Sequence, residues 1–459
     1  MRESAEEDSE RAPLQRLHPN TATRVTLSLE LKVFNIQTIE PSYQYHSIVN
    51  TTDVLVYNNN NSSSMSHKQT SSRKTTAAAM PGETSTVPCA STALFPYNYQ
   101  AVTSTTLSND EYCLHLAHDH SWETVAAAVS DGSLVILQRN TLEKLLTLEP
   151  HEEMVSGLRF SPTDDKILWT SGRDGFVKMW DVRTGNCEKQ LCGKQENSVG
   201  DRFVTCMDIS SNERILCGGT ELMADGAFIL FWDVRGDQLL GTYSDSHTDD
   251  ITQVKFSPKQ PDTLATSSTD CLVNMFDISQ KAEEDALVYC MNTEVTVDKL
   301  FWLNSTSGEE RIAMLTDVES LQYWDMKEAT PLHHFTRQDI ATVMKCKDPS
   351  ECYLVSVNIL GDGSLTLMCG ARSPSQNSSD QLCTLKFNSD TGELKPHGSF
   401  RPRQKLLTTR TSLYHAGTDT YITGDECGIV RLWKPETVQV GGKQPTNKNV
   451  TKKARVRPY

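Results

Sequence analysis

The chain has 459 residues and a formal net charge of −15. Because so acidic a chain repels phosphate groups, its composition excludes the class of proteins that wrap nucleic acid over their whole surface. No stretch reaches the roughly 18 apolar residues that a membrane-spanning helix needs. Acidic residues rather than an apolar segment follow Met1, so we expect an intracellular protein, in the cytoplasm or the nucleus.

Residues 1–95 differ in composition from the remainder of the chain. The segment Thr51–Pro88 is rich in Ser, Thr and Asn. Such a composition buries too little apolar surface to offset the entropy that is lost on ordering. We therefore predict a disordered leader over residues 1–95. An alternative interpretation is that translation begins at Met65 or Met80, so that part of this leader is absent from the mature protein.

Residues 96–440 contain short alternating strands punctuated by Gly, Asp, Ser and Pro, a pattern that predicts an all-β domain. Two of its segments, His151–Trp180 and His247–Phe276, align without a gap. Both contain a leading His, a Phe-Ser-Pro string, a Thr, an Asp and a final aromatic residue that precedes Asp. These coincidences indicate an internal repeat.

Weaker copies of the same unit occur along the rest of the domain. In the third copy Asp225-Gly226 precedes the final residue, as Asp131-Gly132 does in the first. Each copy ends in an aromatic or apolar anchor, and the seven anchors are Leu137, Trp180, Trp232, Phe276, Trp324, Phe387 and Trp433, with Met368 as the alternative to Phe387. A repeat of about 40 to 45 residues that ends in Trp-Asp resembles the WD40 family. The resemblance implies a seven-bladed WD40 β-propeller over residues 96–440, in which Tyr99–Leu107 supplies the outer strand of the last blade and closes the ring.

The resemblance also implies a role for four polar residues of the second blade. In WD40 blades a His, a Ser or Thr, an Asp and a Trp form a hydrogen-bonded chain, and the matching residues are His151, Thr170, Asp174 and Trp180. Because such a chain satisfies buried polar groups, we assign these residues a structural role and not a catalytic one. In the fourth blade Phe276 replaces the Trp, and in the seventh Cys427 replaces the Asp.

Motifs that carry catalysis or cofactor binding are missing from the sequence. It contains no phosphate-binding loop, no dinucleotide-binding glycine pattern, no nucleophile elbow and no H-E-x-x-H string. The 13 cysteines include no C-x-x-C pair, and the neighbours His333 and His334 would point to opposite faces of a strand. We therefore predict no catalytic residue, no metal site, no cofactor and no small-molecule substrate, and hence no enzyme.

Two strings suggest a specific protein partner. Trp180-Asp-Val-Arg183 is echoed in the next blade by Trp232-Asp-Val-Arg235. These strings resemble the box found in substrate receptors of cullin-4 ubiquitin ligases, and the resemblance implies that Arg183 and Arg235 bind the adaptor of the ligase through their planar guanidinium groups. The alternative is that an Arg follows the Trp-Asp pair in many WD40 blades without any such role.

Residues 441–459 form a basic tail. They contain six basic residues and no acidic one, namely Lys443, Lys448, Lys452, Lys453, Arg455 and Arg457. We expect a short disordered tail, and a tail of this charge on an acidic body suggests nuclear import or contact with RNA.

The leading functional hypothesis is a non-enzymatic scaffold that mediates protein–protein interactions in a multiprotein complex, through loops such as Arg372–Asp380, Cys192–Asp201 and Gln280–Asp285. The alternatives are a cullin-4 substrate receptor and a nuclear scaffold for ribosome assembly or RNA.

Overall fold

The computed structural model describes residues 94–108, 111–193, 203–236, 238–304, 310–374, 379–388 and 391–436. The predicted leader up to residue 93 and the predicted basic tail therefore lie outside the described residues, together with the RNA contact assigned to that tail. The described part of the chain is almost entirely β-structure. None of its helices is long and apolar enough to cross a membrane.

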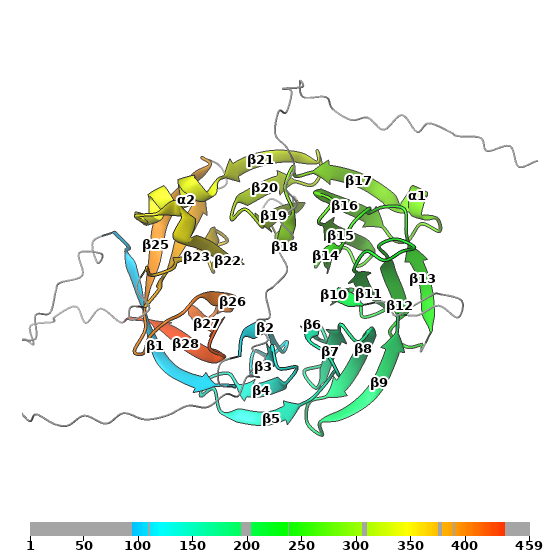
Figure 1. The fold of residues 1–459 in the computed structure, drawn as a ribbon, viewed down its shortest axis with the longest axis horizontal. Coiled ribbons are helices and arrows are strands. Elements are labelled where there is room, and N and C mark those ends of the chain that lie inside the picture. The colour runs from blue at the N-terminus through cyan, green and yellow to red at the C-terminus, as the bar shows by residue number, and fades with distance from the viewer. Residues whose placement is uncertain are drawn as a thin grey trace, which may run out of the picture. The chain divides into compact units, whose positions relative to one another are not determined.

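The strands form five four-stranded sheets and one eight-stranded sheet that joins two further units of four. These seven units stand around a ring, with the first strand of each nearest the centre (Figure 1). The fold is therefore the predicted seven-bladed propeller. The seven predicted anchors all lie on the third strand of a blade, and Phe387, not Met368, is the anchor of the sixth.

The first four blades contain β2 to β17. Their bounds are β2 Cys113–His118, β3 Thr124–Val129, β4 Leu134–Gln138 and β5 Lys144–Leu148 in blade 1; β6 Val155–Phe160, β7 Ile167–Gly172, β8 Phe176–Asp181 and β9 Asn186–Cys192 in blade 2; β10 Val204–Ile209, β11 Ile215–Thr220, β12 Ile229–Asp233 and β13 Leu239–Tyr243 in blade 3; β14 Ile251–Phe256, β15 Thr263–Ser268, β16 Leu272–Asp277 and β17 Leu287–Asn292 in blade 4. Within each blade successive strands pair antiparallel.

The last three blades contain β18 to β28 and the early strand β1. Their bounds are β18 Val297–Asn304, β19 Glu310–Thr316, β20 Leu321–Asp325 and β21 Thr330–Phe335 in blade 5; β22 Cys352–Ile359, β23 Leu365–Ala371, β24 Gln381–Asn388 and β25 Glu393–Arg401 in blade 6; β26 Thr409–His415, β27 Thr420–Asp425 and β28 Ile429–Pro435 in blade 7, with β1 Tyr97–Thr106 as its fourth strand. The seventh blade thus takes its outer strand from the other end of the domain.

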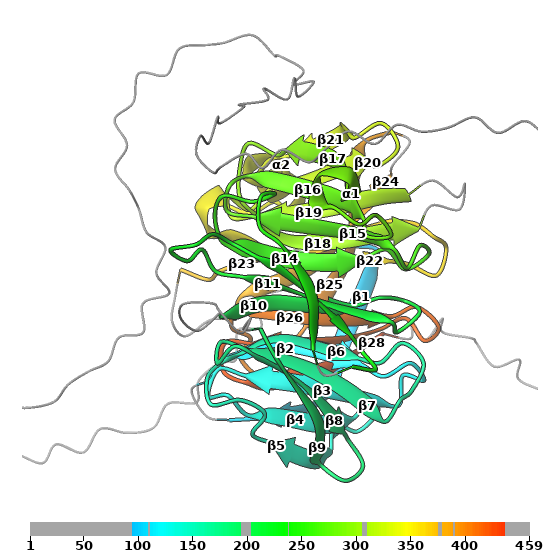
Figure 2. The same cartoon turned by 90° about the vertical axis from the view of Figure 1, so that its right-hand side faces the viewer.

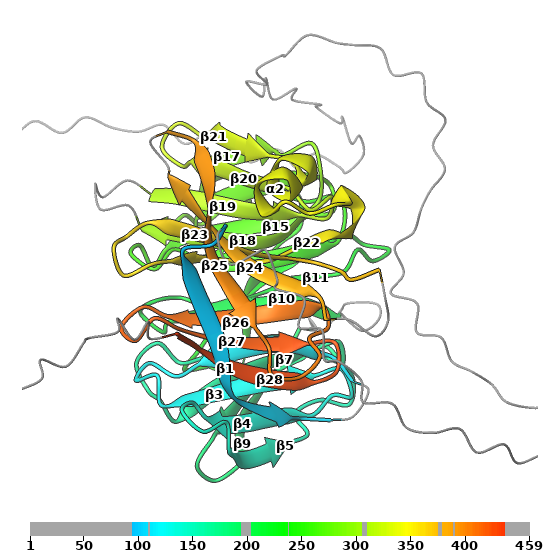
Figure 3. The same ribbon diagram turned by 90° about the vertical axis from the view of Figure 1, so that its left-hand side faces the viewer.

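The ring closes through β1, as predicted. This strand pairs antiparallel with β28, from Tyr99 opposite Pro435 to Thr106 opposite Ile429. Its first residues also pair parallel with β25 of blade 6, where Tyr97 lies opposite Gly398, and Figure 3 shows β1 running alongside both strands. Blades 6 and 7 are therefore one continuous sheet, an arrangement that the sequence pattern did not indicate.

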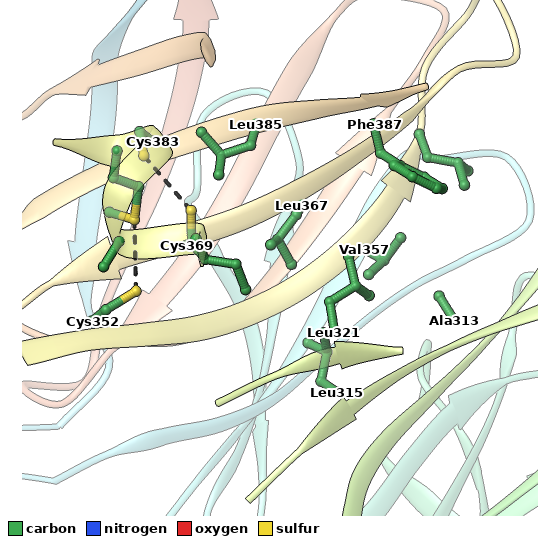
Figure 4. Close-up of a cluster of buried hydrophobic side chains, with 14 of the residues drawn as sticks. Ala313, Leu315, Leu321, Cys352, Val357, Leu367, Cys369, Cys383, Leu385 and Phe387 are labelled. Carbon is green, nitrogen blue, oxygen red and sulfur yellow. Dashed lines mark hydrogen bonds between the residues drawn. The ribbon is translucent and has the colours of Figure 1, made fainter. Parts of the chain in front are cut away.

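Blades are held together by apolar side chains. The buried apolar residues of the described chain divide into seven clusters, and each cluster joins two neighbouring blades. Between blades 5 and 6, for example, Leu315 and Leu321 pack toward Val357, Leu367 and Phe387 (Figure 4). Since burial of apolar surface is the main stabilising term in folding, seven contacts between seven blades require a closed ring.

Polar contacts between the innermost strands reinforce this packing. Every innermost strand contains a register shift near its start, of which the shift between Val155 and Gly157 is one example. The side chains at or beside these shifts donate hydrogen bonds to the next blade. The bonds run from Ser156 Oγ to Val204 O at 2.5 Å, from Thr205 Oγ1 to Ile251 O at 2.5 Å, from Thr252 Oγ1 to Val297 O at 2.6 Å and from Lys299 Nζ to Val355 O at 2.8 Å.

Short helices occupy two of the connections. Helix α1, Glu283–Ala286, lies beside β17 (Figure 2), so the predicted binding loop Gln280–Asp285 is in part helical. The Glu283 carboxylate accepts hydrogen bonds from the backbone of Ser244 at 2.7 Å and of Asp245 at 3.0 Å, and it ties this segment to blade 3. Helix α2, Arg337–Met344, begins with a capping box between Thr336 and Asp339, and a single 3₁₀ turn, Pro349–Glu351, precedes β22.

Candidate partner-binding site at the entry rim

The two ends of the ring carry different connections. Because the strands of a blade alternate in direction, the connection into the first strand and the connection from the second to the third lie at one end. We call that end the entry rim. The turns from the first to the second strand and from the third to the fourth lie at the other end, which we call the exit rim.

One backbone hydrogen bond defines the entry rim in every blade. The residue that follows the second strand donates its N–H to the carbonyl of the residue that precedes the first strand. The seven bonds join Ser130 to Tyr112, Arg173 to Met154, Glu221 to Phe203, Thr269 to Asp250, Asp317 to Thr296, Arg372 to Glu351 and Glu426 to Thr408, at 2.9 to 3.4 Å. These residues therefore occupy equivalent positions in the seven blades. Differences between their side chains change the surface that the entry rim exposes to solvent.

The predicted polar chain of blade 2 lies directly beneath this rim. His151 Nδ1 lies 2.9 Å from Asp174 Oδ1, and His151 Nε2 lies 2.8 Å from Thr170 Oγ1. Trp180 Nε1 donates to the same Thr170 oxygen at 3.1 Å. Burial lowers the pKa of His151, which favours the neutral ring. A neutral ring donates from Nδ1 to Asp174 and accepts at Nε2 from Thr170, so each of these groups has a partner.

This arrangement supports a structural role for the four residues. Blade 4 repeats it in part, because His247 lies 3.0 Å from Asp270 and 2.8 Å from Thr266. Phe276 supplies no donor there. Asn274 lies nearby and donates to the carbonyl of Ser246 at 2.6 Å.

A related polar position escaped the sequence analysis. Two residues before the anchor, four blades have a polar side chain that donates to a backbone carbonyl of the connection entering the blade. The donors and their acceptors are Lys178 to Pro150, Asn274 to Ser246, Gln322 to Thr293 and Arg431 to Lys405, at 2.6 to 2.9 Å. In the sequence, this position is marked only by a single polar residue within an otherwise apolar strand.

In blade 7 this position forms a buried ion pair. The Arg431 guanidinium contacts the Asp425 carboxylate, and each side chain is 1% exposed. Asp425 is the last residue of β27, as Gly172 is of β7, so the pair occupies other positions than His151 and Asp174 do in blade 2. The sequence analysis noted Cys427 at the Asp position and did not find this ion pair.

Two blades present apolar side chains where other blades have the buried Asp. Leu222 and Val318 each lie two residues beyond the second strand, the position that Asp174 holds in blade 2 and Asp270 in blade 4. The two Asp side chains are 8% and 5% exposed, whereas Leu222 is 46% and Val318 50% exposed. Each apolar residue therefore faces solvent instead of completing a polar chain.

Exposed apolar residues lie on the entry rim and on the outermost strands. Ten large apolar residues of the described chain are exposed, and they fall into three groups. Tyr112, Met154, Leu222 and Val318 lie on the entry rim, Leu145, Leu240, Val288 and Leu332 lie on outermost strands, and Tyr97 and Val102 lie on β1. None of these ten lies on the exit rim. The entry rim thus combines loop connections, which often carry binding residues, with four of these exposed apolar side chains.

Charged groups lie beside two of the exposed apolar residues of the entry rim, Tyr112 and Val318. The Arg410 guanidinium lies 4.8 Å from the ring centre of Tyr112 and forms an ion pair with Glu426 at 3.0 Å. In blade 5 burial and the nearby Asp317 raise the pKa of Asp298. Burial also raises the pKa of Glu319. An ion pair therefore lies beside Tyr112, and Asp317 and Glu319 adjoin Val318 in sequence. Such charges orient a partner that the apolar side chains contact.

Arg183 and Arg235 lie on the exit rim, away from the polar chain of blade 2. Arg183 Nη2 contacts Asp181 at 2.6 Å and Arg235 Nη2 contacts Asp233 at 2.9 Å. Hydrogen bonds from each Arg lower the pKa of its Asp to about 2. The Arg side chains are 60% and 71% exposed. Arg183 and Arg235 therefore have the same geometry in neighbouring blades. Both lie on the exit rim, at the opposite end of the ring from the entry rim.

No group of three or more His, Cys, Asp or Glu in the described part of the chain could hold a metal ion. Two neighbouring thiols, Cys369 and Cys383, are buried in the contact between blades 5 and 6. Their sulfur atoms lie 3.7 Å apart (Figure 4). Burial raises the pKa of Cys369 well above its usual value, which favours the unreactive thiol.

Comparison with known proteins agrees with the fold. Residues 142–181 and 237–277 match the family model for the WD domain, G-beta repeat. These segments end at Asp181 and Asp277, each directly after a predicted anchor. The chain is a WD40-repeat β-propeller protein.

Its relatives include WD-repeat proteins of several organisms. The strings between Cys217 and Leu287 resemble WD repeat-containing protein 89, and the chain is 26% identical to the homolog of that protein from Dictyostelium discoideum over 49% of this chain and 58% of the relative. It is 22% identical to an uncharacterized WD repeat-containing protein of Schizosaccharomyces pombe over 73% of this chain and 99% of the relative. It is also 22% identical to the GATOR2 complex protein WDR24 of Danio rerio, over 67% of this chain and 38% of the relative.

Proposed function

We propose that this protein is a non-enzymatic scaffold that binds a partner protein through its entry rim and holds it within a multiprotein complex. The observation that carries the proposal is the pair Leu222 and Val318. Each places an exposed apolar side chain at a position where blades 2 and 4 bury an Asp. Both residues lie on loop connections of the entry rim, where binding residues are disproportionately found, and this location favours a binding role for them.

The rest of the rim supports the same function. Tyr112 and Met154 extend the apolar set across blades 1 and 2, and the ion pair of Arg410 with Glu426 lies beside Tyr112. Apolar anchors surrounded by charged residues are the usual composition of a protein interface. The relative WDR24 is by its name a GATOR2 complex protein, which supports assembly into a complex without indicating that this chain joins the same one.

Substitution on the rim tests the proposal. We expect Leu222→Asp combined with Val318→Asp to lower the recovery of specific partners in affinity purification about tenfold or more, because a charge within an apolar contact costs more than 1 kcal/mol. The matched control is Leu240→Asp combined with Val288→Asp. It places the same changes at equally exposed positions of the outermost strands β13 and β17. Equal partner recovery from the two double variants would contradict the proposal.

A second candidate function is that of a cullin-4 substrate receptor. The observation that favours it is the identical, exposed presentation of Arg183 and Arg235 in neighbouring blades. In this function we expect Arg183→Ala combined with Arg235→Ala to abolish binding of the ligase adaptor while the circular dichroism spectrum stays unchanged. Arg401→Ala is the control, because Arg401 is also an exposed arginine but lies on β25. Adaptor binding that survives the double substitution would exclude this function.

A further inference from the structure

A cluster of aromatic and basic residues lies on the exit rim where blade 1 meets blade 7, beside the neighbouring strands β2 and β26 (Figure 1). The rings of His118 and Trp122 are stacked, with centres 3.5 Å apart and planes 16° apart. The centre of His415 lies 4.9 Å from that of Trp122. Arg139 completes the group, which we call the seam cluster: His118, Trp122, Arg139 and His415.

Trp122 holds an unfavourable backbone conformation. Its φ is +58°, in the left-handed region where a side chain meets its own backbone. The equivalent turn position is Glu213 in blade 3 and Gly363 in blade 6. Glycine suits this turn best, yet the chain has its largest residue type there, partly exposed and between two imidazoles. A strained backbone at a partly exposed aromatic residue favours a role other than folding.

Arg139 lacks partners for two of its donors. Its Nε and Nη1 atoms are buried and have no hydrogen-bond partner within the described part of the chain. A buried donor without an acceptor is costly, and most so when it is charged. Each fork of a guanidinium, Nε with Nη2 or Nη1 with Nη2, includes one of these two atoms. A carboxylate bound at either fork would satisfy one of them.

Two acidic residues adjoin the cluster in sequence, Asp119 next to His118 and Glu123 next to Trp122. The Asp119 oxygens accept from the backbone of Glu123 at 2.8 Å and of Thr124 at 3.0 Å, and from the Thr124 hydroxyl at 2.6 Å. The Glu123 side chain is exposed, and its carboxylate is not a partner of Arg139 Nε or Nη1. Arg139 contributes to the lowered pKa of His415, so the two groups lie within electrostatic reach of each other. On a chain with a net charge of −15, this concentration of donors is a local exception.

We propose that the seam cluster is a binding site for the carboxylate of an Asp or Glu residue in an acidic segment of a partner protein. Arg139 binds the carboxylate through one fork of its guanidinium, and Trp122 provides the apolar wall for the acidic side chain. The site lies on the exit rim and is separate from the exposed apolar residues of the entry rim. It therefore adds a second site at which the scaffold binds a partner protein.

Fluorescence anisotropy with a fluorescein-labelled oligoglutamate peptide tests this site on the full-length protein. We expect saturable binding that Arg139→Gln weakens about tenfold or more, because charge-assisted hydrogen bonds are lost. Arg403→Gln, the same change at an exposed arginine far along the chain, should leave the affinity unchanged. The entry-rim variant Leu222→Asp with Val318→Asp should also bind the peptide normally, which separates this site from the proposed function.

A second measurement covers the case in which Arg139→Gln does not fold. In wild-type protein labelled with 5-fluorotryptophan, the ¹⁹F resonance that Trp122→Phe removes should shift on addition of the oligoglutamate peptide. An unshifted resonance, or an affinity that Arg139→Gln leaves unaltered, would overturn the proposal. Displacement of the peptide by inorganic phosphate at a concentration where acetate has no effect would overturn it as well, because the site would then select phosphate.

Discussion

Replacing Tyr99 by Ala is expected to lower the free energy of unfolding by about 3–5 kcal/mol, the usual cost of removing a buried aromatic side chain. Tyr99 is 1% exposed and is the side chain through which β1 enters the core. Its ring stacks on Phe400 of blade 6 with centres 4.9 Å apart and meets Tyr421 of blade 7 edge-on at 5.1 Å. Its hydroxyl donates to Asp419 at 3.0 Å.

Chemical denaturation followed by circular dichroism measures this effect. Tyr99→Phe should cost only about 1 kcal/mol, because it removes one hydrogen bond and keeps the ring. Val102→Ala on the same strand should change stability by no more than about 0.5 kcal/mol, since Val102 is 38% exposed. If Tyr99→Ala were no more destabilising than Val102→Ala, β1 would not be the strand that closes the ring.

Asp425→Ala is expected to destabilise the protein by about 3–5 kcal/mol, because it leaves a buried guanidinium without its counter-charge. Arg431 and Asp425 are each 1% exposed, so solvent cannot replace the lost partner. Combining Asp425→Ala with Arg431→Leu should recover a substantial part of this loss, since the uncompensated charge is then removed as well.

An exposed ion pair provides the control for this prediction. Lys395 and Glu393 lie 2.6 Å apart with side chains that are 68% and 56% exposed. Glu393→Ala should therefore cost no more than about 1 kcal/mol. A double variant of Asp425 and Arg431 that is less stable than Asp425→Ala alone would show that the ion pair is not the source of the stability.

The parts of the fold that the sequence predicted are those with a strong local signal. Large anchors such as Trp180 and Trp232 recur along the chain, and each of these two is followed by an Asp that ends the strand. Alternation and turn residues then define the other strands of each blade. The closing role of β1 followed from the same logic, because the last blade ends without a fourth strand.

The features that the sequence did not predict depend on contacts that no recurring pattern specifies. The parallel pairing of Tyr97 with Gly398 joins two blades without any local pattern. The ion pair of Arg431 with Asp425 joins residues on the paired strands β27 and β28, at positions where the repeat pattern specifies neither residue. In both cases the pairing depends on how the strands pack in the ring and not on a recurring sequence pattern.

The exposed position of Leu222 on the entry rim could not be predicted from the sequence because one loop differs in length. The sequence analysis placed Asp225 before the anchor of blade 3, as Asp131 is placed in blade 1. In the structure the connection after β11 is longer and contains a turn closed by Met223 and Gly226. The position equivalent to Asp174 is therefore Leu222, and the exposed apolar residue became visible only when the strands were aligned in space.

Site-specific photo-crosslinking in cells tests most directly whether the entry rim binds a partner protein. A photoreactive benzoyl-phenylalanine is placed in full-length protein at position 222 or 318, and at position 240 or 288 as the control on the outermost strands. The proposed function predicts that positions 222 and 318 yield crosslinks to the same partner protein and that positions 240 and 288 do not. Equal crosslinking from both pairs, or crosslinking from positions 240 and 288 alone, would contradict binding at the entry rim.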